Sequence, residues 1–440
     1  MASLPDTVSP GLHGSAATEL EEEHIVHWKR SDPGLLWSGW LARARGDASG
    51  LRRWRLWIWW SAPMTRRERA QALLGLLLFP PLTIREAWRC VRRCGGKVRD
   101  RHGIRAQRQV LDILGLAFGA GLPPIAYYKY QLFLSERRAL AHQYVEDAGR
   151  FLLVLAARLP PAPDARVGAN KGVFAHWCRE QGFPVVHSLL EVDGERIVSH
   201  AALPATDLFS KPENWRAGKG VELWRHVPAG GESRWQGRDG EALDVSALEQ
   251  RLREHSRAYG RPIVLQPFLV NHPVIRALGN GTLCTLRVMT VRHHPGSAQA
   301  LLAVLRIGTG DAQADNFDLG GLATAIDLES GRCGKAITKR GDYPVERLSA
   351  NPDSGVRIEG VELPHWREAI ALAARAHEQL QYGMPVMGWD IAILADGPVF
   401  IEANRFPGGN IAQMPTGLPL GASAFAPCVV DALKKGFRVR

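Results

Sequence analysis

The 440-residue sequence contains no apolar run long enough for a plain transmembrane helix, which needs about 18 or more such residues. Its first 24 residues include four glutamates and no apolar core segment, so we expect no signal peptide. The six cysteines are dispersed, and only Cys90 and Cys94 lie close together. No further cysteine or histidine pair accompanies them, which favours two small residues on a basic helix over a zinc site. We therefore predict reduced thiols in a cytoplasmic protein.

The sequence also lacks an internal repeat, a Ser/His/Asp or Cys/His nucleophile motif, and the helix-turn-helix or RNP signatures of nucleic-acid binding. Hydrophobic residues make up 45% and charged residues 22%, which excludes a wholly disordered chain, collagen or a coiled coil. The length allows about two or three globular domains.

Acidic residues are scarce in one segment. The whole chain has a net charge of +11, and residues 51–110 alone contain 15 Lys and Arg against 3 Asp and Glu, which is +12. This segment begins with four tryptophans and three arginines in Leu51–Trp60. A local basic block of this kind is more often an interaction surface than a requirement of the fold. The predicted partner is a phosphate-rich polymer or an anionic membrane.

Two capping boxes predict helices in this block. We expect one helix from the Thr65 box to the prolines at 80–81, and a second from the Thr83 box to the glycines at 95–96. In the second helix, four apolar residues share a face opposite the arginines: Ile84, Ala87, Trp88 and Val91. Three interpretations of residues 51–130 remain open. They are contact with an anionic membrane surface, a helical domain with a tryptophan core and solvated arginines, and nucleic-acid binding, which no motif supports.

The segment Gly388–Asn404 predicts a β-hairpin. Two alternating stretches flank residues 395–397, which we expect to form a three-residue loop. In an antiparallel hairpin with this loop, the numbers of paired residues add to the same value. These residues are then opposite each other: Leu394 and Pro398, Ala392 and Phe400, Asp390 and Glu402. The period of two then directs four residues into the core: Ile391, Ile393, Val399 and Ile401.

Asp390, Glu402 and Asn404 therefore share one face of the predicted hairpin. Two carboxylates directly opposite each other repel and destabilise the pairing, and a cation between them removes that cost. All three side chains offer oxygen ligands, the set that suits Mg²⁺ or Mn²⁺. The alternative is a solvated hairpin with an incidental acid pair.

The D-x(11)-E-x-N pattern on a late hairpin resembles the metal-binding element of ATP-grasp ligases. Further stretches resemble other elements of that superfamily in the expected order: Asn170-Lys171, Gly182–Val185, Leu208–Pro212, Gly218–Val221, Val264–Phe268, Asn271–Pro273, Thr285–Val288, Asp315–Phe317 and Gly320-Gly321. The combination is most similar to the sugar-transfer-associated ATP-grasp family, which is related to α-L-glutamate ligases.

The resemblance implies an α+β fold, in which two α+β subdomains of residues 165–425 grip a nucleotide. A flexible segment of residues 1–50 and a basic, mainly helical region of residues 51–160 would precede this ATP-grasp domain. A proline-rich stretch at 160–163 reads as a stiff linker between them. Residues 426–440 would form a C-terminal tail.

The resemblance also implies ATP, with Mg²⁺ or Mn²⁺ held by the hairpin residues, and it assigns the nucleotide contacts. Lys171 and Lys211 would hold the α- and β-phosphates, and Lys219 in a glycine-flanked loop would reach the β- and γ-phosphates. The alternative is that these lysines are structural or solvated. Gln266 and Phe268 would line the adenine at the hinge, although many members have glutamate at the position of Gln266.

Arg287 would stabilise charge on the transferring phosphoryl group, and its alternative role is an ion pair with a hairpin carboxylate. His272, Asn316 and Gly321 would line the acceptor pocket, where structural roles compete. The phosphate loop at 213–221 is poorer in glycine than many such loops.

The function implied is an ATP-dependent carboxylate–amine ligase that works through an acyl phosphate. Its substrates would be a small-molecule or glycan carboxylate and an amine, in a cell-surface polysaccharide or peptide precursor. The protein would be cytoplasmic, at the inner face of the membrane if the basic region meets lipid. Two alternatives are a kinase of the same fold, and a membrane- or polyanion-binding protein with a nucleotide-sensing domain.

Overall fold

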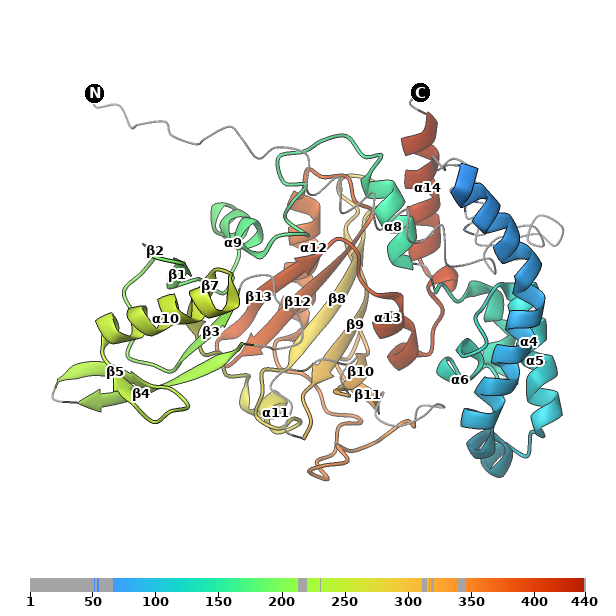
Figure 1. The fold of residues 1–440 in the computed structure, drawn as a ribbon, viewed down its shortest axis with the longest axis horizontal. Helices are drawn as coiled ribbons and strands as arrows, with labels where there is room; N and C mark the ends of the chain where they lie inside the picture. Colours follow the sequence, from blue (N-terminus) through green and yellow to red (C-terminus); the bar gives the residue numbers. More distant parts are fainter. Residues whose placement is uncertain are drawn as a thin grey trace.

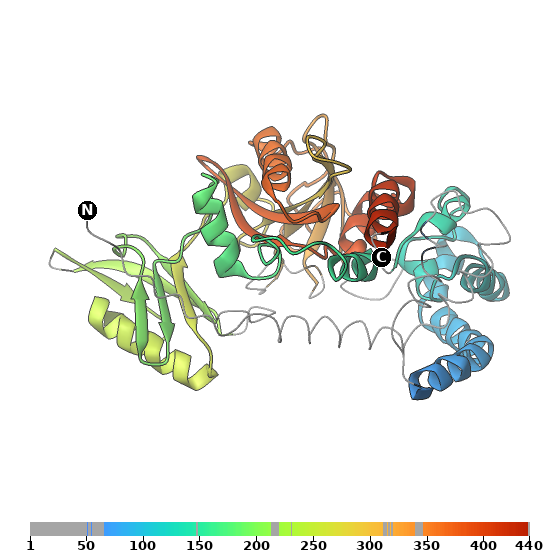
Figure 2. The same ribbon diagram turned by 90° about the horizontal axis from the view of Figure 1, so that it is seen from above.

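The computed structural model describes Leu51, Trp54 and residues 66–438, except 147, 213–219, 230, 311–314, 316, 318–319 and 339–345. Three parts lie side by side in the molecule: a group of helices, a larger sheet and a smaller sheet (Figures 1 and 2). Helices and antiparallel sheets together confirm the predicted α+β class. The predicted flexible segment of residues 1–50 lies outside the described residues, as do Lys219 and Asn316.

The helical part contains the following elements: α4 (Arg66–His102), α5 (Ala106–Ala120), α6 (Ala126–Lys129), α7 (Ser135–Ala139), η1 (Ala141–Gln143) and α8 (Ala148–Ala156). Among the described residues, no helix combines the length and the hydrophobicity needed to cross a bilayer.

The prediction of two separate helices in the basic block is wrong, because α4 continues through both prolines and both glycines. At Gly95 a Cβ atom would lie 2.9 Å from Gln109 Oε1, and Gln109 Nε2 donates to the Gly95 carbonyl at 3.0 Å. Gly95 therefore allows α4 and α5 to approach closely instead of ending the helix. Pro81 removes the helical donor to the Leu77 carbonyl, and this break lies on an exposed part of the helix, where Leu77 is 76% exposed.

The buried side of α4 also differs from the predicted face. Ala87 and Val91 are buried, but Ile84 and Trp88 are 44% and 42% exposed. The buried side instead continues through three other residues: Cys90, Cys94 and Val98. An i, i+3, i+4, i+7 pattern fits more than one helix face, and packing against α5 selected the second one.

The smaller sheet has the strand order β2-β1-β7-β3-β4-β5-β6, and every pair is antiparallel. Its elements are β1 (Leu190–Asp193), β2 (Arg196–Ser199), β3 (Leu208–Pro212), β4 (Glu222–Ala229), β5 (Glu232–Gln236), β6 (Ala242–Leu243), α10 (Val245–Tyr259) and β7 (Ile263–Pro267). Asp244 caps α10 by accepting from the Ala247 amide at 2.9 Å. Leu248 and Leu252 of α10 pack on Trp224 and other apolar residues of the sheet.

The larger sheet has the order β11-β10-β9-β8-β12-β13. Its strands are β8 (Thr285–Val291), β9 (Gln299–Ile307), β10 (Leu322–Ile326), β11 (Cys333–Thr338), β12 (Val386–Leu394) and β13 (Gly397–Asn404). The remaining helices are α9 (Lys171–Glu180), α11 (Pro273–Arg276), α12 (Trp366–Gln379), α13 (Gly409–Thr416), η3 (Leu420–Ala422) and α14 (Phe425–Arg438). The segment expected as a C-terminal tail is therefore largely helical, with Val429 and Leu433 of α14 buried.

The two faces of the larger sheet carry different layers. Helix α12 packs against one face, where His377 contacts Thr290 of β8. Helix α13 and the helical part pack against the other face, over Val304, Ala323 and Ile337 of β9–β11. Strands β8, β12 and β13 continue that second face beyond the covering helices, and Arg287, Asp390 and Glu402 lie there.

The hairpin of β12 and β13 confirms the pairing of Asp390 with Glu402 but not the whole predicted register. Next to the turn the pairs are Leu394–Gly397, Ile393–Pro398, Ala392–Val399 and Ile391–Phe400, so the loop has two residues and the register is shifted by one. A bulge between Ile391 and Asp390 then restores the predicted register. As a result Phe400 is fully buried, whereas Val399 and Ile401 are only half-buried.

Candidate functional site

A buried network of charges lies in the larger sheet around Asp390. This residue is 2% exposed and stands between Arg287 on β8 and Glu402 on β13. Arg287 donates to both Asp390 oxygens, from Nε to Oδ1 and from Nη2 to Oδ2, the latter at 2.8 Å. Arg306 on β9 donates from Nη2 to Oδ2 at 2.8 Å. Burial opposes ionisation of Asp390, but the two guanidinium groups outweigh it and hold its pKa well below the usual value.

The network continues toward Asp315. Thr285 donates to Asp315 Oδ2 through its hydroxyl and, at 2.8 Å, through its backbone amide. Arg306 Nε donates to the Thr285 hydroxyl at 2.9 Å and lies 3.6 Å from Asp315 Oδ2. Burial raises the pKa of Asp315, and the charge of Arg306 offsets part of that rise. Two guanidinium groups and two carboxylates therefore neutralise each other inside the sheet.

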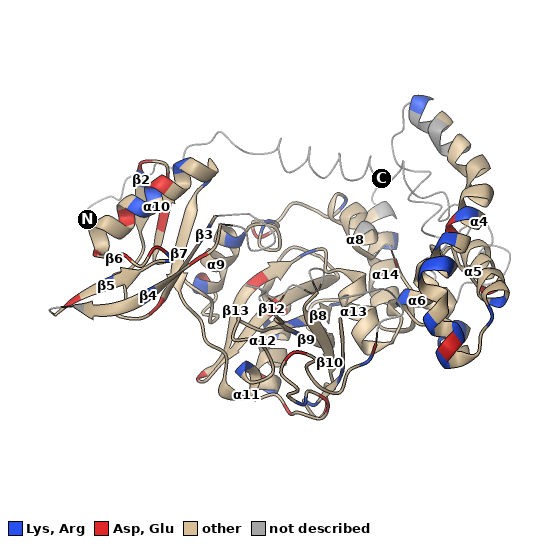
Figure 3. Cartoon of the chain, turned by 60° about the horizontal axis from the view of Figure 1, so that its bottom comes forward, with Lys and Arg blue, Asp and Glu red and all other residues tan. Residues whose placement is uncertain are grey.

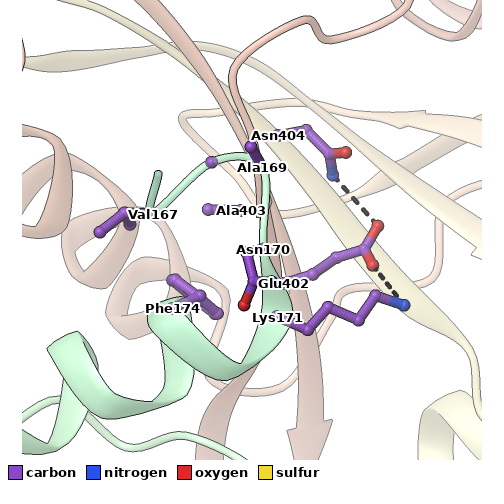
Figure 4. A pocket seen from close by; sticks show the side chains of 9 residues that line it. Val167, Ala169, Asn170, Lys171, Phe174, Glu402, Ala403 and Asn404 are labelled. Carbon is purple, nitrogen blue, oxygen red and sulfur yellow. Dashed lines mark hydrogen bonds and ion pairs between the residues drawn. The ribbon is translucent and has the colours of Figure 1, made fainter. Parts of the chain in front are cut away.

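Glu402 forms a second cluster at the edge of this sheet. Its Oε2 is 2.9 Å from Lys171 Nζ, and its Oε1 accepts from Asn404 Nδ2 at 3.2 Å. Lys171 is the first residue of α9, which Asn170 caps by accepting from the Val173 amide at 2.9 Å. These side chains lie around a pocket of about 100 Å³ (Figure 4). Its lining residues are Val167, Gly168, Ala169, Asn170, Lys171, Phe174, Glu402, Ala403 and Asn404.

Lys211 approaches this cluster from β3 of the smaller sheet. Burial and the charge of Lys171 lower the pKa of Lys211 to about 8, while Glu402 acts in the opposite direction. The two sheets therefore bring their charged residues together here, although Lys171 and Lys211 are 40 positions apart in the sequence.

The predicted hinge residues lie beside Lys211 in the smaller sheet. Gln266 on β7 pairs with Phe209, two residues before Lys211 on β3. Phe268 follows β7, and its amide donates to the Asp207 carbonyl at 2.9 Å. Both predicted hinge side chains are half-buried.

The predicted acceptor residues are placed differently. His272 caps the short helix α11, accepting from the Val274 amide at 3.3 Å, and its own amide donates to the Ile393 carbonyl at 2.9 Å. These bonds give His272 a structural role near the turn of the hairpin. Gly321 is buried just before β10 and contributes no side chain.

Arg306 is the residue of this site that the sequence analysis did not identify. It pairs with Thr285 across β8 and β9, two positions from the pair Arg287–Val304. Side chains alternate between the two faces of a strand, so Arg306 lies on the same face of the sheet as Arg287. The sequence alone does not show this, because it does not reveal that β8 and β9 are neighbours.

The donor set of the hairpin fits a divalent cation that prefers oxygen. Among the described residues, no three His, Cys, Asp or Glu side chains lie close enough to hold a metal, so the Asn404 amide would be a necessary third ligand. Positive charge is meanwhile supplied by Arg287 and Arg306 at Asp390, and by Lys171 at Glu402. To hold a cation, Glu402 would have to exchange or share Lys171, and Asp390 would have to exchange or share its arginine partners.

The sequence matches the family described as sugar-transfer associated ATP-grasp over residues 156–424. That match spans more than half of the chain, and it includes both sheets and the charged residues around Asp390. The fold is therefore an ATP-grasp fold. The chain belongs to the sugar-transfer-associated ATP-grasp family, as its motifs had indicated.

A search of curated proteins finds no match to the sequence. Solved structures with a similar arrangement include the D-alanine–D-alanine ligase of Bacillus anthracis, at 12% identity and a TM-score of 0.32, covering 63% of this chain and 69% of that one. The L-amino acid ligase of Bacillus licheniformis is 15% identical with a TM-score of 0.31, and the match covers 61% of this chain and 48% of that one. The D-alanine–D-alanine ligase of Coxiella burnetii is 10% identical with a TM-score of 0.36, and the match covers 67% of this chain and 66% of that one.

Proposed function

We propose that this protein is an ATP-dependent carboxylate–amine ligase that forms an acyl phosphate and then an amide. The observation that carries the proposal is the meeting of cations from two sheets beside two carboxylates and an amide. Lys211 comes from the smaller sheet, whereas Lys171 and Arg287 come from the other side of the site. A polyanionic nucleotide between two sheets needs positive charge from both.

Lys171 and Lys211 would bind the phosphates, with Lys219 of the phosphate loop as a third cation. A phosphate oxygen that draws Lys171 away from Glu402 would free that carboxylate for a metal ligand role. Asp390, Glu402 and Asn404 would then hold Mg²⁺ or Mn²⁺, which neutralises charge on the β- and γ-phosphates when bound. Gln266 and Phe268 would contact the base or the ribose.

The chemistry requires charge stabilisation more than covalent participation by the protein. A substrate carboxylate oxygen forms a bond to the γ-phosphorus while the bridging P–O bond breaks, and ADP leaves with the electron pair. An amine nitrogen then bonds to the acyl carbon, phosphate leaves, and the nitrogen loses a proton. Arg287, fixed by its two bonds to Asp390, would stabilise the phosphoryl oxygens during transfer.

The cysteines support a mechanism without a thiol nucleophile. All six are buried. Burial raises the pKa of the Cys90 and Cys428 thiols to about 11, and that of the Cys178, Cys284 and Cys333 thiols to about 12. Thiols with such pKa values carry almost no thiolate near neutral pH.

The family's association with sugar transfer supports a cell-surface polysaccharide or peptide precursor as the substrate. The test measures ADP release with a panel of uronic acids and amino acids, each supplied alone and together with an amine. The proposal predicts ADP release that requires a carboxylate and increases when the amine is added. Release that requires only a hydroxyl acceptor would instead identify a kinase.

A further inference from the structure

Helix α4 exposes an unusual number of large apolar side chains. Six of the fourteen exposed large hydrophobic residues in the described part of the protein lie on this one helix. They are Leu74 (55% exposed), Leu77 (76%), Leu78 (44%), Leu82 (43%), Ile84 (44%) and Trp88 (42%). Scattered exposed apolar residues are ordinary, but a contiguous set on one element marks an interaction surface.

These six residues occupy one side of α4. At 3.6 residues per turn they fall within about half of the helix circumference. The residues that pack on α5 and on the larger sheet fall on the remaining half: Ala87, Cys90, Val91, Cys94 and Val98. The exposed side is therefore separate from the side that holds the helical part together.

The same outward side becomes basic toward the C-terminal half of the helix. Arg85, Arg89 and Arg92 are exposed and lie in the same half-circumference as the leucines. Along its length α4 contains ten Lys and Arg against three Asp and Glu. Figure 3 shows the basic residues gathered on α4 and the N-terminal half of this helix extending beyond the other helices. We call the six apolar residues and these three arginines the α4 surface.

We propose that the α4 surface binds an anionic lipid membrane. Leucines and a tryptophan beside arginines match the acyl boundary and the phosphate headgroups of such a membrane together. A nucleic acid would pair with the arginines but leave the leucines in water. A second copy of the chain would offer the same leucines and arginines, but this surface contains, among its described residues, no acidic residue that could pair with the arginines. Charge complementarity and apolar area therefore both favour lipid.

Helix α4 is packed firmly against the larger sheet. Its buried side shares one core with Val304, Ala323 and Ile337 of the larger sheet. The helical part and the catalytic sheet are therefore packed together, and docking of α4 would hold the nucleotide site at a fixed distance from the lipid. This consequence rests on the proposed function, whereas the lipid binding itself does not.

The experiment is co-sedimentation of the full chain with phosphatidylcholine vesicles, with and without phosphatidylglycerol, at low and high salt. Binding is expected to be much stronger with the anionic vesicles, and salt should weaken it without abolishing it, because apolar burial is not screened. Leu77→Glu should weaken binding about tenfold or more, since it removes an exposed leucine that the lipid would bury. Arg92→Glu should weaken it about fivefold for each unit of charge lost.

Matched substitutions lie far from this surface. Leu418→Glu changes another leucine that is 67% exposed, and Arg257→Glu changes an arginine of α10 with a half-exposed side chain. Both controls should bind vesicles as the unchanged protein does. Thermal unfolding and ADP release, which should be unchanged in all four variants, separate this test from that of the proposed function.

Three results would overturn the proposal. One is a folded protein that fails to bind anionic vesicles at low salt. Another is equal loss of binding in the control and α4 variants. The third is a different partner for the α4 surface, seen either as a dimer in sedimentation velocity that Leu77→Glu dissociates, or as RNA binding that Arg92→Glu abolishes and Leu77→Glu does not.

Discussion

Lys211 has a charge that its surroundings make costly, because its half-buried side chain lies near the like charge of Lys171. A bound phosphate would remove that cost by supplying a counter-ion. This arrangement favours Lys211 as a ligand contact over a role within the fold alone.

Lys211→Ala is expected to weaken ATP binding by about 1.5–3 kcal/mol, the range for a lost charge-assisted hydrogen bond. Titration of a fluorescent ATP analogue into the variant and the unchanged protein measures this difference. Lys335→Ala, which changes an exposed lysine of β11, is the control and should leave affinity as it is. Equal affinities for Lys211→Ala and the unchanged protein would remove Lys211 from the nucleotide site.

Arg287→Lys is expected to lower kcat more than it weakens ATP binding. A guanidinium can hold two phosphoryl oxygens while remaining fixed by Asp390, whereas an ammonium acts as a point charge. Steady-state kinetics with varied ATP separate the two effects, and a thermal unfolding curve checks that the loss of a buried pair has not unfolded the protein. An unchanged kcat with weaker ATP binding would limit Arg287 to binding the ground state.

Single residues of the site were predictable where the sequence itself fixed their neighbours. Asp390, Glu402 and Asn404 lie on one hairpin, so alternation placed them on one face, although the exact pairing of the two carboxylates depends on a bulge that alternation does not show. Arg306 was not predictable, because its place beside Asp390 depends on which strands are adjacent in the larger sheet. His272 could be named from its motif, but its capping of α11 was visible only in the structure.

At the scale of elements, the hairpin shows how a correct pair can come from an incorrect loop. The sequence favoured a three-residue loop, whereas the strands join through two residues and are shifted by one position near the turn. The bulge that restores the register lies beside Asp390, at the functional end of the hairpin. Bulges are common next to active sites because they redirect side chains, but alternation alone does not locate them.

The predicted helix ends within α4 were wrong for a similar reason. Proline and glycine pairs usually end helices, yet the Gly95 position is required by contact with Gln109 of α5. That contact joins elements on either side of a turn, and a local propensity rule does not include it.

Helix α12 offers a pH test of the sheet it covers. Thr290 accepts from Trp389 Nε1 at 2.8 Å and lies 2.7 Å from His377 Nδ1, while His377 Nε2 lies 3.0 Å from the Met384 carbonyl. The Thr290 hydroxyl thus donates a hydrogen bond to Nδ1, and the protonated Nε2 donates one to the Met384 carbonyl. Burial lowers the pKa of His377 to about 3, so this histidine stays neutral in the folded protein.

The unfolded chain binds one more proton than the folded one between the ordinary histidine pKa, about 6.5, and the lowered value. His377 should therefore reduce stability as pH falls through that window, by up to about 1.4 kcal/mol per pH unit. Urea unfolding between neutral pH and about pH 5 measures the slope. His377→Gln should flatten it, and His187→Gln at an exposed position should not. An unchanged slope in His377→Gln would contradict the buried neutral state.

At the scale of the whole molecule, the order of short motifs along the chain was enough to predict the α+β class and the family. The relation between the helical part and the larger sheet was not predictable, because the two share a core through residues far apart in sequence. Val91 and Val304 belong to that one cluster. The basic block, which accounts for the net positive charge of the chain, is therefore divided: one side of α4 lies in the core and the other in solvent.

The proposed reaction makes an acyl phosphate from ATP and a carboxylate at this site. It is tested most directly by trapping that intermediate with hydroxylamine, using the carboxylate panel of the ADP-release assay. We expect a hydroxamate to form in equal amount with ADP, and neither product to form with Glu402→Gln, which should unfold at the same temperature as the unchanged protein. ADP released without hydroxamate, with the phosphate recovered on a hydroxyl group, would contradict it.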